Sequence, residues 1–415
     1  MARLENNRIA RRLLDPFQAT SERAEESFRP RGDWRLWGVP LFIGVLGLVI
    51  SFVGWATDSH QFYFSYLVGW SFCLTIAIGA LYFVMIQHLT KARWSIVVRR
   101  IAESLLWSFP LLAILGIPIL FGMHDLYHWT HEDVVAADAV LSGKAAYLNV
   151  PFYIIRLALY FLIWSTVGYK LYRLSLEQDS RLDPRIPGRQ RRVSAWGLIL
   201  IAVTTAFASY DILMSVDPHW FSTIFGVYIF AGAFMSIHAL IALVAIALQQ
   251  SSKPFRPVIT ADHYQDLGKM MFGFVVFWAY IAFSQYMLIW YGNIPEETIW
   301  YLHRLENGWE VHSAILLIFH FIIPFMILLP RAVKRSKPLM VVMAIWLLIM
   351  HWFDLRWLTM PVLHPENPDI HFLDITCWIG LTSIFVAAFM YRLSQHSLVP
   401  LNSPYLAESL RFENT

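Results

Sequence analysis

Ten long, mostly apolar stretches constrain the fold of this sequence more than any other feature. A transmembrane helix needs about 20 such residues, because the hydrocarbon core is roughly 30 Å thick and each helical residue rises about 1.5 Å. Strands of a membrane barrel would instead show segments of about ten residues that alternate apolar with polar. The pattern predicts an all-α polytopic membrane protein with spans at 36–56, 62–87, 104–122, 147–172, 194–216, 223–248, 264–291, 310–330, 338–360 and 370–393.

The composition agrees with a membrane protein. The 415 residues are 57% hydrophobic and 15% charged, whereas a soluble domain is about half apolar and a quarter charged. A water-soluble globule, a disordered chain and a nucleic-acid binder are therefore poor fits. The two cysteines, Cys73 and Cys377, lie in apolar runs, and the sequence has neither a haem-attachment motif nor a zinc-type cysteine spacing. Any iron–sulfur cluster or c-type haem must then belong to a partner chain.

The distribution of lysine and arginine predicts the orientation. The connections on one side of the membrane carry 27 of the 32 basic residues, and those on the other side carry only Lys144 and Arg304. Because cytoplasmic loops are enriched in basic residues, both termini are expected in the cytoplasm. We expect a cytoplasmic arm at 1–35, a membrane domain at 36–393 and a cytoplasmic tail at 394–415. The arm has no apolar segment of the kind found in a signal peptide.

The outer connection 123–146 is acidic and carries three histidines, His124, His128 and His131. Their spacing fits one helix face, but no fixed fourth ligand accompanies them, so a zinc site is not predicted. A solvated surface is the favoured interpretation, and a docking face for a partner is the alternative.

Ionisable residues inside the spans are the candidate functional residues, because each costs about 3 kcal/mol at bilayer depth even on lenient scales. Four of them should lie within roughly 6 to 14 Å of the outer boundary, where acids and bases on adjoining helices can pair. These four are Arg156, Asp211, Asp354 and Arg356. The remaining candidates are His238, His320, His351 and Asp374, with Lys269 and His312 nearer the span ends.

Two interpretations of this set remain open. Each residue alone fits a structural polar contact between helices, whereas charged groups at one depth followed inward by titratable histidines resemble a polar cavity or a proton route. We expect His351, one turn from Asp354, to be able to hydrogen-bond on the same helix face. A b-type haem held by histidines such as His238, His312 and His320 is a sharper alternative, but the small residues that usually surround a macrocycle are not evident.

A short internal repeat in the sequence suggests two related helical bundles. The triplet Tyr210-Asp211-Ile212 near the end of the fifth span resembles Phe353-Asp354-Leu355 near the end of the ninth. This repeat predicts that spans two to five and spans six to nine form two bundles with the same arrangement of helices. Paired bundles with buried charges also suit a secondary transporter, but the prolines inside the spans do not occupy matching positions, as the broken helices of a transporter would require.

Several longer segments make the sequence resemble a known family, the F subunit of bacterial alternative complex III. The resemblance covers roughly residues 30–395. The fourth-span residue Arg156 and the triplet Phe353-Asp354-Leu355 with Met360-Pro361 also fit. The longer segments are KAAYLNVPF at 144–152, MSVDPHWFST at 214–223, DLGK at 266–269, AFSQY at 282–286 and WYGNIPEE at 290–297.

The resemblance implies a fold and a set of partners. It implies the paired four-helix bundles of NrfD-like membrane subunits, which are also found in polysulfide reductase, in a multi-pass protein of the bacterial inner membrane. It also implies membership in a respiratory quinol:cytochrome c oxidoreductase, or one with another periplasmic acceptor. The implied partners are the NrfD-like C subunit, the iron–sulfur B subunit, the subunits that carry haem c and a terminal oxidase.

The resemblance leaves two mechanisms open. In the first, menaquinol or ubiquinol binds near the outer end of spans two to five, and Asp211 or His238 accepts a proton. In the second, the chain binds no quinol and supports the complex while its buried polar groups conduct protons. Lys269 and His320 would then form an inner half-channel, with Asp354 and Asp374 nearer the exit.

Overall fold

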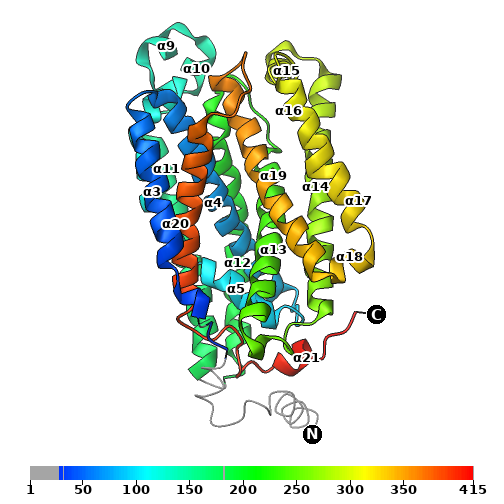
Figure 1. Ribbon diagram of the computed structural model, residues 1–415. Helices are drawn as coiled ribbons and strands as arrows, with labels where there is room; N and C mark the ends of the chain where they lie inside the picture. Colours follow the sequence, from blue (N-terminus) through cyan, green and yellow to red (C-terminus); the bar gives the residue numbers. More distant parts are fainter. Residues whose placement is uncertain (1–27, 31, 181–182, 415) are drawn as a thin grey trace.

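The computed structural model describes residues 28–30, 32–180 and 183–414. In this part of the chain every regular element is a helix, and ten helical spans are long and apolar enough to cross a membrane. The predicted all-α, multi-pass architecture is confirmed. Figure 1 shows the spans side by side in one upright bundle, with the C-terminus at its lower end.

The first five spans are α3 (Gly38–Trp55), α4 (Ser59–Leu89), a broken third span of α5 (Ile96–Leu105), α6 (Phe109–Leu115) and α7 (Ile117–Phe121), α11 (Val150–Ser180), and α12 (Ile186–Ile212) with η4 (Met214–Val216). The other five are α13 (Phe225–Ser251), α14 (Ala261–Gly292), the three-part span of α16 (Trp309–Ile315), η6 (Leu316–Ile322) and α17 (Ile323–Leu328), α19 (Lys337–Leu363), and α20 (Phe372–Leu393).

The third span differs from its prediction. It begins at Ile96, eight residues before the expected start at 104, and all of α5 is buried. The charged side chains of Arg99, Arg100 and Glu103 made this segment resemble a loop. They are tolerated inside the protein because Arg99 Nε donates to Glu103 Oε1 at 3.0 Å, so opposite charges neutralise each other.

Helices α4 and α13 form the centre of the molecule and pack against each other. The apolar window of α4 is buried along its whole length, and that of α13 is mostly buried. A side chain at Gly79 of α4 would collide with the Ala233 carbonyl of α13, so glycine is what allows this close approach. Small residues serve this purpose in membranes, where lipid removes most of the hydrophobic drive for helix association.

Each helix of the central pair belongs to one of two bundles. The first bundle comprises α4, the third span, α11 and α12, and the second bundle comprises α13, α14, the α16–α17 span and α19. Contacts of α13 and α19 with α4 join them, and α3 packs on α20 at the edge (Figure 1). The exposed faces of α3 and α14 carry large apolar side chains suited to lipid.

Short helices close the two ends of the bundle. At the end labelled α9 and α10 in Figure 1 lie α8 (Met123–Leu126), η3 (His128–Thr130), α9 (Glu132–Ala137), α10 (Ala139–Lys144) and α15 (Pro295–Leu302). At the opposite end lie η2 (Gly32–Arg35), η5 (Lys253–Phe255), α18 (Arg331–Arg335) and α21 (Leu406–Leu410). The second end holds the basic loops, so we call it the inner end and the first the outer end.

Candidate functional site

The buried acid of the first bundle, Asp211, forms a bidentate ion pair with Arg156. Arg156 donates to both carboxylate oxygens, from Nε and from Nη2, each at 2.9 Å. The Tyr160 hydroxyl donates to the same carboxylate at 2.8 Å. The Arg156 guanidinium lies 3.8 Å from the ring centroid of Tyr147 and 4.4 Å from that of Phe152. The acid and base expected at this depth therefore pair, with aromatic rings shielding the base.

A second ion pair joins α19 to α20. Arg356 Nε donates to Asp374 Oδ2 at 3.0 Å. Asp374 also accepts hydrogen bonds from Gln61 and Ser65 of α4, at 3.0 and 2.5 Å from Oδ1. Asp374 lies in the first turn of α20, where its side chain also caps the helix through the backbone N–H of His371. This cluster ties three helices together.

The buried acid of the second bundle, Asp354, has a different environment. It is 2% exposed, and it accepts hydrogen bonds from the Tyr228 hydroxyl and from Trp278 Nε1, the latter at 3.1 Å. No lysine, arginine or histidine within the described residues forms an ion pair with it. Asp354 is thus a buried carboxyl group held only by neutral donors.

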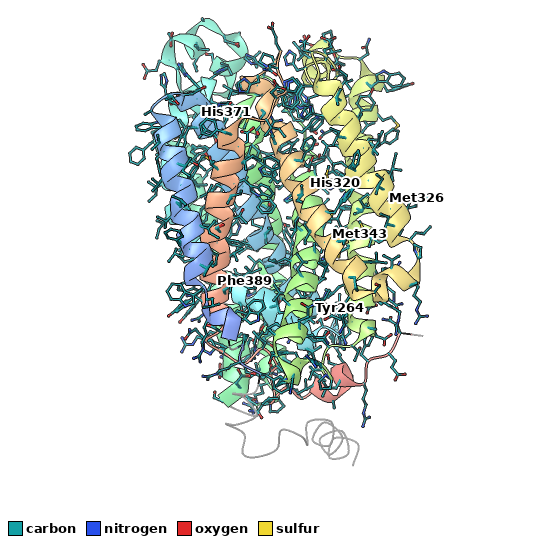
Figure 2. The ribbon with its side chains drawn as sticks, in the orientation of Figure 1. Tyr264, His320, Met326, Met343, His371 and Phe389 are labelled. Carbon is teal, nitrogen blue, oxygen red and sulfur yellow. The ribbon has the colours of Figure 1, made fainter. Side chains whose placement is uncertain are left out.

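His320 lies directly behind the Trp278 donor. The two rings stack with centroids 4.1 Å apart and planes 27° apart. His320 is fully buried, and neither ring nitrogen makes a hydrogen bond of ordinary geometry with the described residues, although the backbone of Met350 lies nearby. Figure 2 shows His320 near mid-height of the second bundle. The residue belongs to the π-helical segment η6, and such segments are frequent at functional sites.

His351 and His238 continue this row of buried histidines. His351 Nε2 lies 2.9 Å from the Thr75 hydroxyl of α4, and its Nδ1 has no partner among the described residues. His351 therefore does not make the expected hydrogen bond with Asp354, because its ring turns toward α4. His238 Nδ1 lies 2.6 Å from the Phe234 carbonyl, and its Nε2 is unpartnered within the described chain.

The buried histidines pack against aromatic side chains. His320 stacks on Trp278, and His238 meets the Phe234 ring edge to face with centroids 4.6 Å apart. His312 stacks on Phe353 with planes 3° apart. Across the described residues, no group of three or more histidine, cysteine or acidic side chains is placed to hold a metal ion.

Lys269 lies apart from the other candidates. Its side chain is about half exposed at the inner end, where Nζ contacts Asp266 at 2.9 Å and Asn414 at 2.7 Å. The nearby Lys334, which sequence reasoning missed, is buried instead, and its Nζ donates to the carbonyls of Leu328 and Leu329. Burial, with a smaller effect of Lys269, lowers the pKa of Lys334.

Two further buried charges were also missed. Glu103 forms a cluster near the inner end with His88, Arg99, Arg100 and Ser175. Near the outer end, Arg304 donates to the carbonyls of Trp300 and Leu358, each at 2.8 Å, and lies over the Trp300 ring. Burial lowers the pKa of Arg304. The only sequence signal for either group was a charged residue adjoining an apolar run.

A scan against protein-family models and a search of curated proteins each found no match for this sequence.

Proposed function

We propose that this chain is a membrane subunit of a respiratory complex that oxidises quinol, and that it carries protons through its second bundle with Asp354 as the exchanging group. Membership in the complex is supported by the resemblance to the F subunit of alternative complex III. The proton role is supported by one observation, a fully buried carboxyl group without a cationic partner.

The environment of Asp354 suits proton exchange because two opposing effects act on it. Burial disfavours the charged carboxylate, while the hydrogen bonds from Tyr228 and Trp278 favour it. A group balanced in this way can hold a proton and release it with a small change in its surroundings. Asp211 differs from Asp354, since a buried guanidinium donates two hydrogen bonds to its carboxylate.

The histidines supply the inward continuation of the path. Trp278 lies between Asp354 and His320, hydrogen-bonded to the first and stacked on the second, so a proton that moves between the acid and the imidazole passes around the indole through water. The His351 ring lies against Gly232 of α13, and His238 follows six residues later on that helix, a rise of about 9 Å from Gly232 at 1.5 Å per residue. One imidazole nitrogen can accept a proton and the other can donate one, so these side chains can relay protons where water bridges the gaps between them. Lys334 lies at the inner end of the same bundle.

The competing mechanism places quinol near the outer end of the first bundle, with Asp211 or His238 as its base. A base must have room to accept a proton, yet both oxygens of Asp211 already bind Arg156, and Tyr160 adds a third hydrogen bond. This geometry favours a structural role for Asp211. A quinol site on this chain would then need His238 as its base, and the mechanism that we favour places menaquinol or ubiquinol on a partner subunit.

Membership in a complex can be tested by purification of the tagged chain from its native membrane. We expect iron and c-type haem to copurify with it, as measured by metal analysis and by the visible absorption of the reduced sample. A stable preparation of the chain alone, without either, would overturn the proposed membership.

The proton role is tested by Asp354→Asn in the assembled complex. Asparagine keeps the shape of the side chain but cannot exchange a proton, so we expect at least a tenfold loss of proton release coupled to quinol oxidation. Proton release would be followed with a pH-sensitive dye in proteoliposomes. The matched control is Asp138→Asn in the outer connection, which should leave the rate of proton release unchanged. Proton release by Asp354→Asn at the unmodified rate would contradict the proposal.

A further inference from the structure

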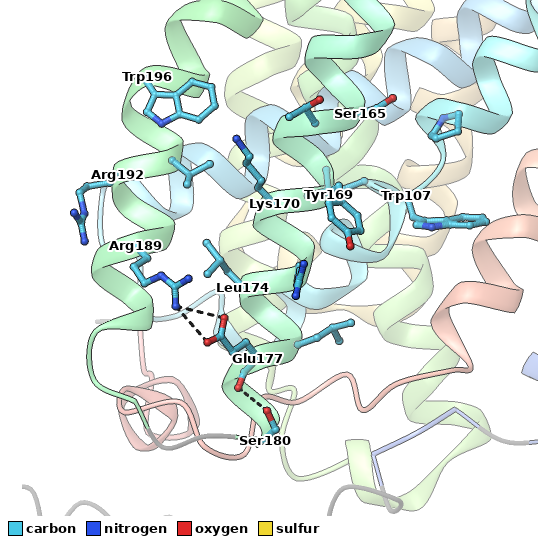
Figure 3. Close-up of a pocket in the computed structure, with 16 residues that line it drawn as sticks. Trp107, Ser165, Tyr169, Lys170, Leu174, Glu177, Ser180, Arg189, Arg192 and Trp196 are labelled. Atoms are coloured by element: carbon cyan, nitrogen blue, oxygen red, sulfur yellow. Dashed lines mark hydrogen bonds and ion pairs between the residues drawn. The ribbon is translucent and has the colours of Figure 1, made fainter.

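A large groove opens on the inner half of the first bundle, away from the buried acids. Its walls come from the junction of α5 and α6, from α11 and from α12, and its volume is about 1480 Å³ (Figure 3). Pockets for drug-sized molecules occupy roughly 300 to 1,000 Å³. The groove is therefore large enough for a larger amphipathic molecule.

The inner part of the groove is strongly basic. Lys170, Arg173, Arg189 and Arg192 line it, and the only acidic residue in its walls is Glu177. Glu177 pairs with Arg189 at 3.2 Å, as Figure 3 shows. Within the described residues, Lys170, Arg173 and Arg192 have no carboxylate partner. Three cations thus remain available to an anionic ligand.

Aromatic side chains border the basic part. Trp107, Tyr169 and Trp196 line the groove and are each more than 40% exposed. Tryptophan and tyrosine gather where a membrane meets water, so these rings indicate the depth of the lipid headgroups. Lys170 Nζ lies 5.6 Å from the centre of the Trp196 ring. The cations are therefore held at the level of the phosphates of the inner leaflet.

Outward of these three aromatic residues, the exposed faces of α11 and α12 become apolar. Leu162 on α11 and Ile199 and Val203 on α12 are each more than half exposed and lie outward of the groove along their helices. The surface is therefore basic at its inner end, aromatic in the middle and aliphatic toward the membrane centre. A phospholipid with an anionic headgroup has the complementary sequence of charge and apolar surface.

We propose that this groove is a binding site for an anionic phospholipid of the cytoplasmic leaflet. Lys170, Arg173 and Arg192 bind its phosphate, and its acyl chains lie along the apolar faces of α11 and α12. The commitment to a lipid follows from the joined basic and aliphatic surfaces, since a free phosphate needs only the first. The site is independent of the proton path, which lies in the other bundle.

The test is lipid binding to the delipidated full-length protein, measured by native mass spectrometry. The probes are phosphatidylglycerol, cardiolipin, zwitterionic phosphatidylethanolamine and inorganic phosphate. We expect the two anionic lipids to bind at least tenfold more tightly than phosphatidylethanolamine, and millimolar phosphate not to displace them. Equal binding of all three lipids, or displacement by phosphate alone, would overturn the proposal.

A pair of double variants locates the site. Lys170→Gln with Arg192→Gln should weaken binding of the anionic lipids about tenfold or more, because each basic residue near the membrane surface contributes to headgroup attraction. Lys253→Gln with Lys337→Gln removes the same charge from exposed inner-end positions outside the groove and should leave binding unchanged. If both double variants bound the anionic lipids equally weakly, net charge alone would explain the loss, and this would contradict the proposed site. Full lipid binding by the first variant would overturn the proposal.

Discussion

Asp211 and Asp354 occupy similar places in the two bundles yet differ in chemistry. Each follows an aromatic residue and precedes an aliphatic one, near the outer end of α12 or α19. Asp211 is neutralised by a guanidinium on the neighbouring helix, whereas Asp354 is held by a phenol and an indole. A shared sequence triplet therefore does not fix the role of a buried acid, because the facing helix supplies the partner.

Geometry explains why Asp354 lacks a cation although Arg356 is only two residues away. Residues two apart on a helix do not face each other. Arg356 accordingly points to α20, where it binds Asp374 and the backbone carbonyls of Pro368 and Asp369.

The largest effect should come from breaking the ion pair of the first bundle. Arg156→Leu leaves Asp211 as an unpaired buried charge, so we expect a loss of about 3 to 5 kcal/mol in the free energy of unfolding. Denaturant unfolding of the purified protein in mild detergent measures this. The double variant with Asp211→Leu removes both charges and should recover most of the loss. An undiminished stability of Arg156→Leu would show that Asp211 does not depend on this pair.

A smaller effect is expected from Gly232→Ala in the second bundle. The added methyl group would lie 2.8 Å from atoms of the His351 ring, so the ring must move and its contact with Thr75 must change. We expect a several-fold slower proton release and a destabilisation of about 1 to 3 kcal/mol, measured with the pH-sensitive dye and by denaturant unfolding. Gly273→Ala is the matched control, because nothing lies within 4 Å of its added methyl group. Equal rates in the two variants would remove His351 from the path.

The smallest effect should be a loss of folding stability at acid pH that arises from His396, outside both bundles. Burial and the nearby Arg392, Arg100 and Arg29 lower the pKa of His396 in the inner tail to about 4. The unfolded chain binds this proton near pH 6.5, so stability is lost as pH falls from about 6.5 toward 4 and is unaffected above that range.

Because His396 is partly solvated, the effect should stay below about 1 kcal/mol. Melting temperatures at pH 7.5 and pH 5 measure it, and His396→Gln should show the smaller decrease. A decrease in the variant as large as that of the unmodified protein would assign the acid sensitivity to other groups.

Much of the fold could be predicted from the sequence, because apolar length and basic loops act through the membrane itself. The same reasoning located Arg156, Asp211, Asp354 and Arg356 as groups that need partners, and the structure pairs Arg156 with Asp211 and Arg356 with Asp374 but, within its described residues, gives Asp354 no cation. It could not assign the pairs, since pairing depends on how the helices are rotated against each other.

The misses have related causes. The charged start of the third span looked like a loop, because Arg99 and Glu103 neutralise each other only after α5 has packed. Lys334 looked like one more basic loop residue, although folding buries it beneath the end of α17. The π-helical turn at His320 has no sequence signature that composition or periodicity reveals.

Infrared difference spectroscopy of the complex during quinol oxidation tests the central claim most directly, since the C=O stretch of a carboxylic acid appears or disappears as its proton moves. We predict a carboxyl signal in the unmodified complex that is absent in Asp354→Asn and shifted in Asp354→Glu. An unchanged signal in Asp354→Asn would contradict the assignment of Asp354 as the proton-exchanging group.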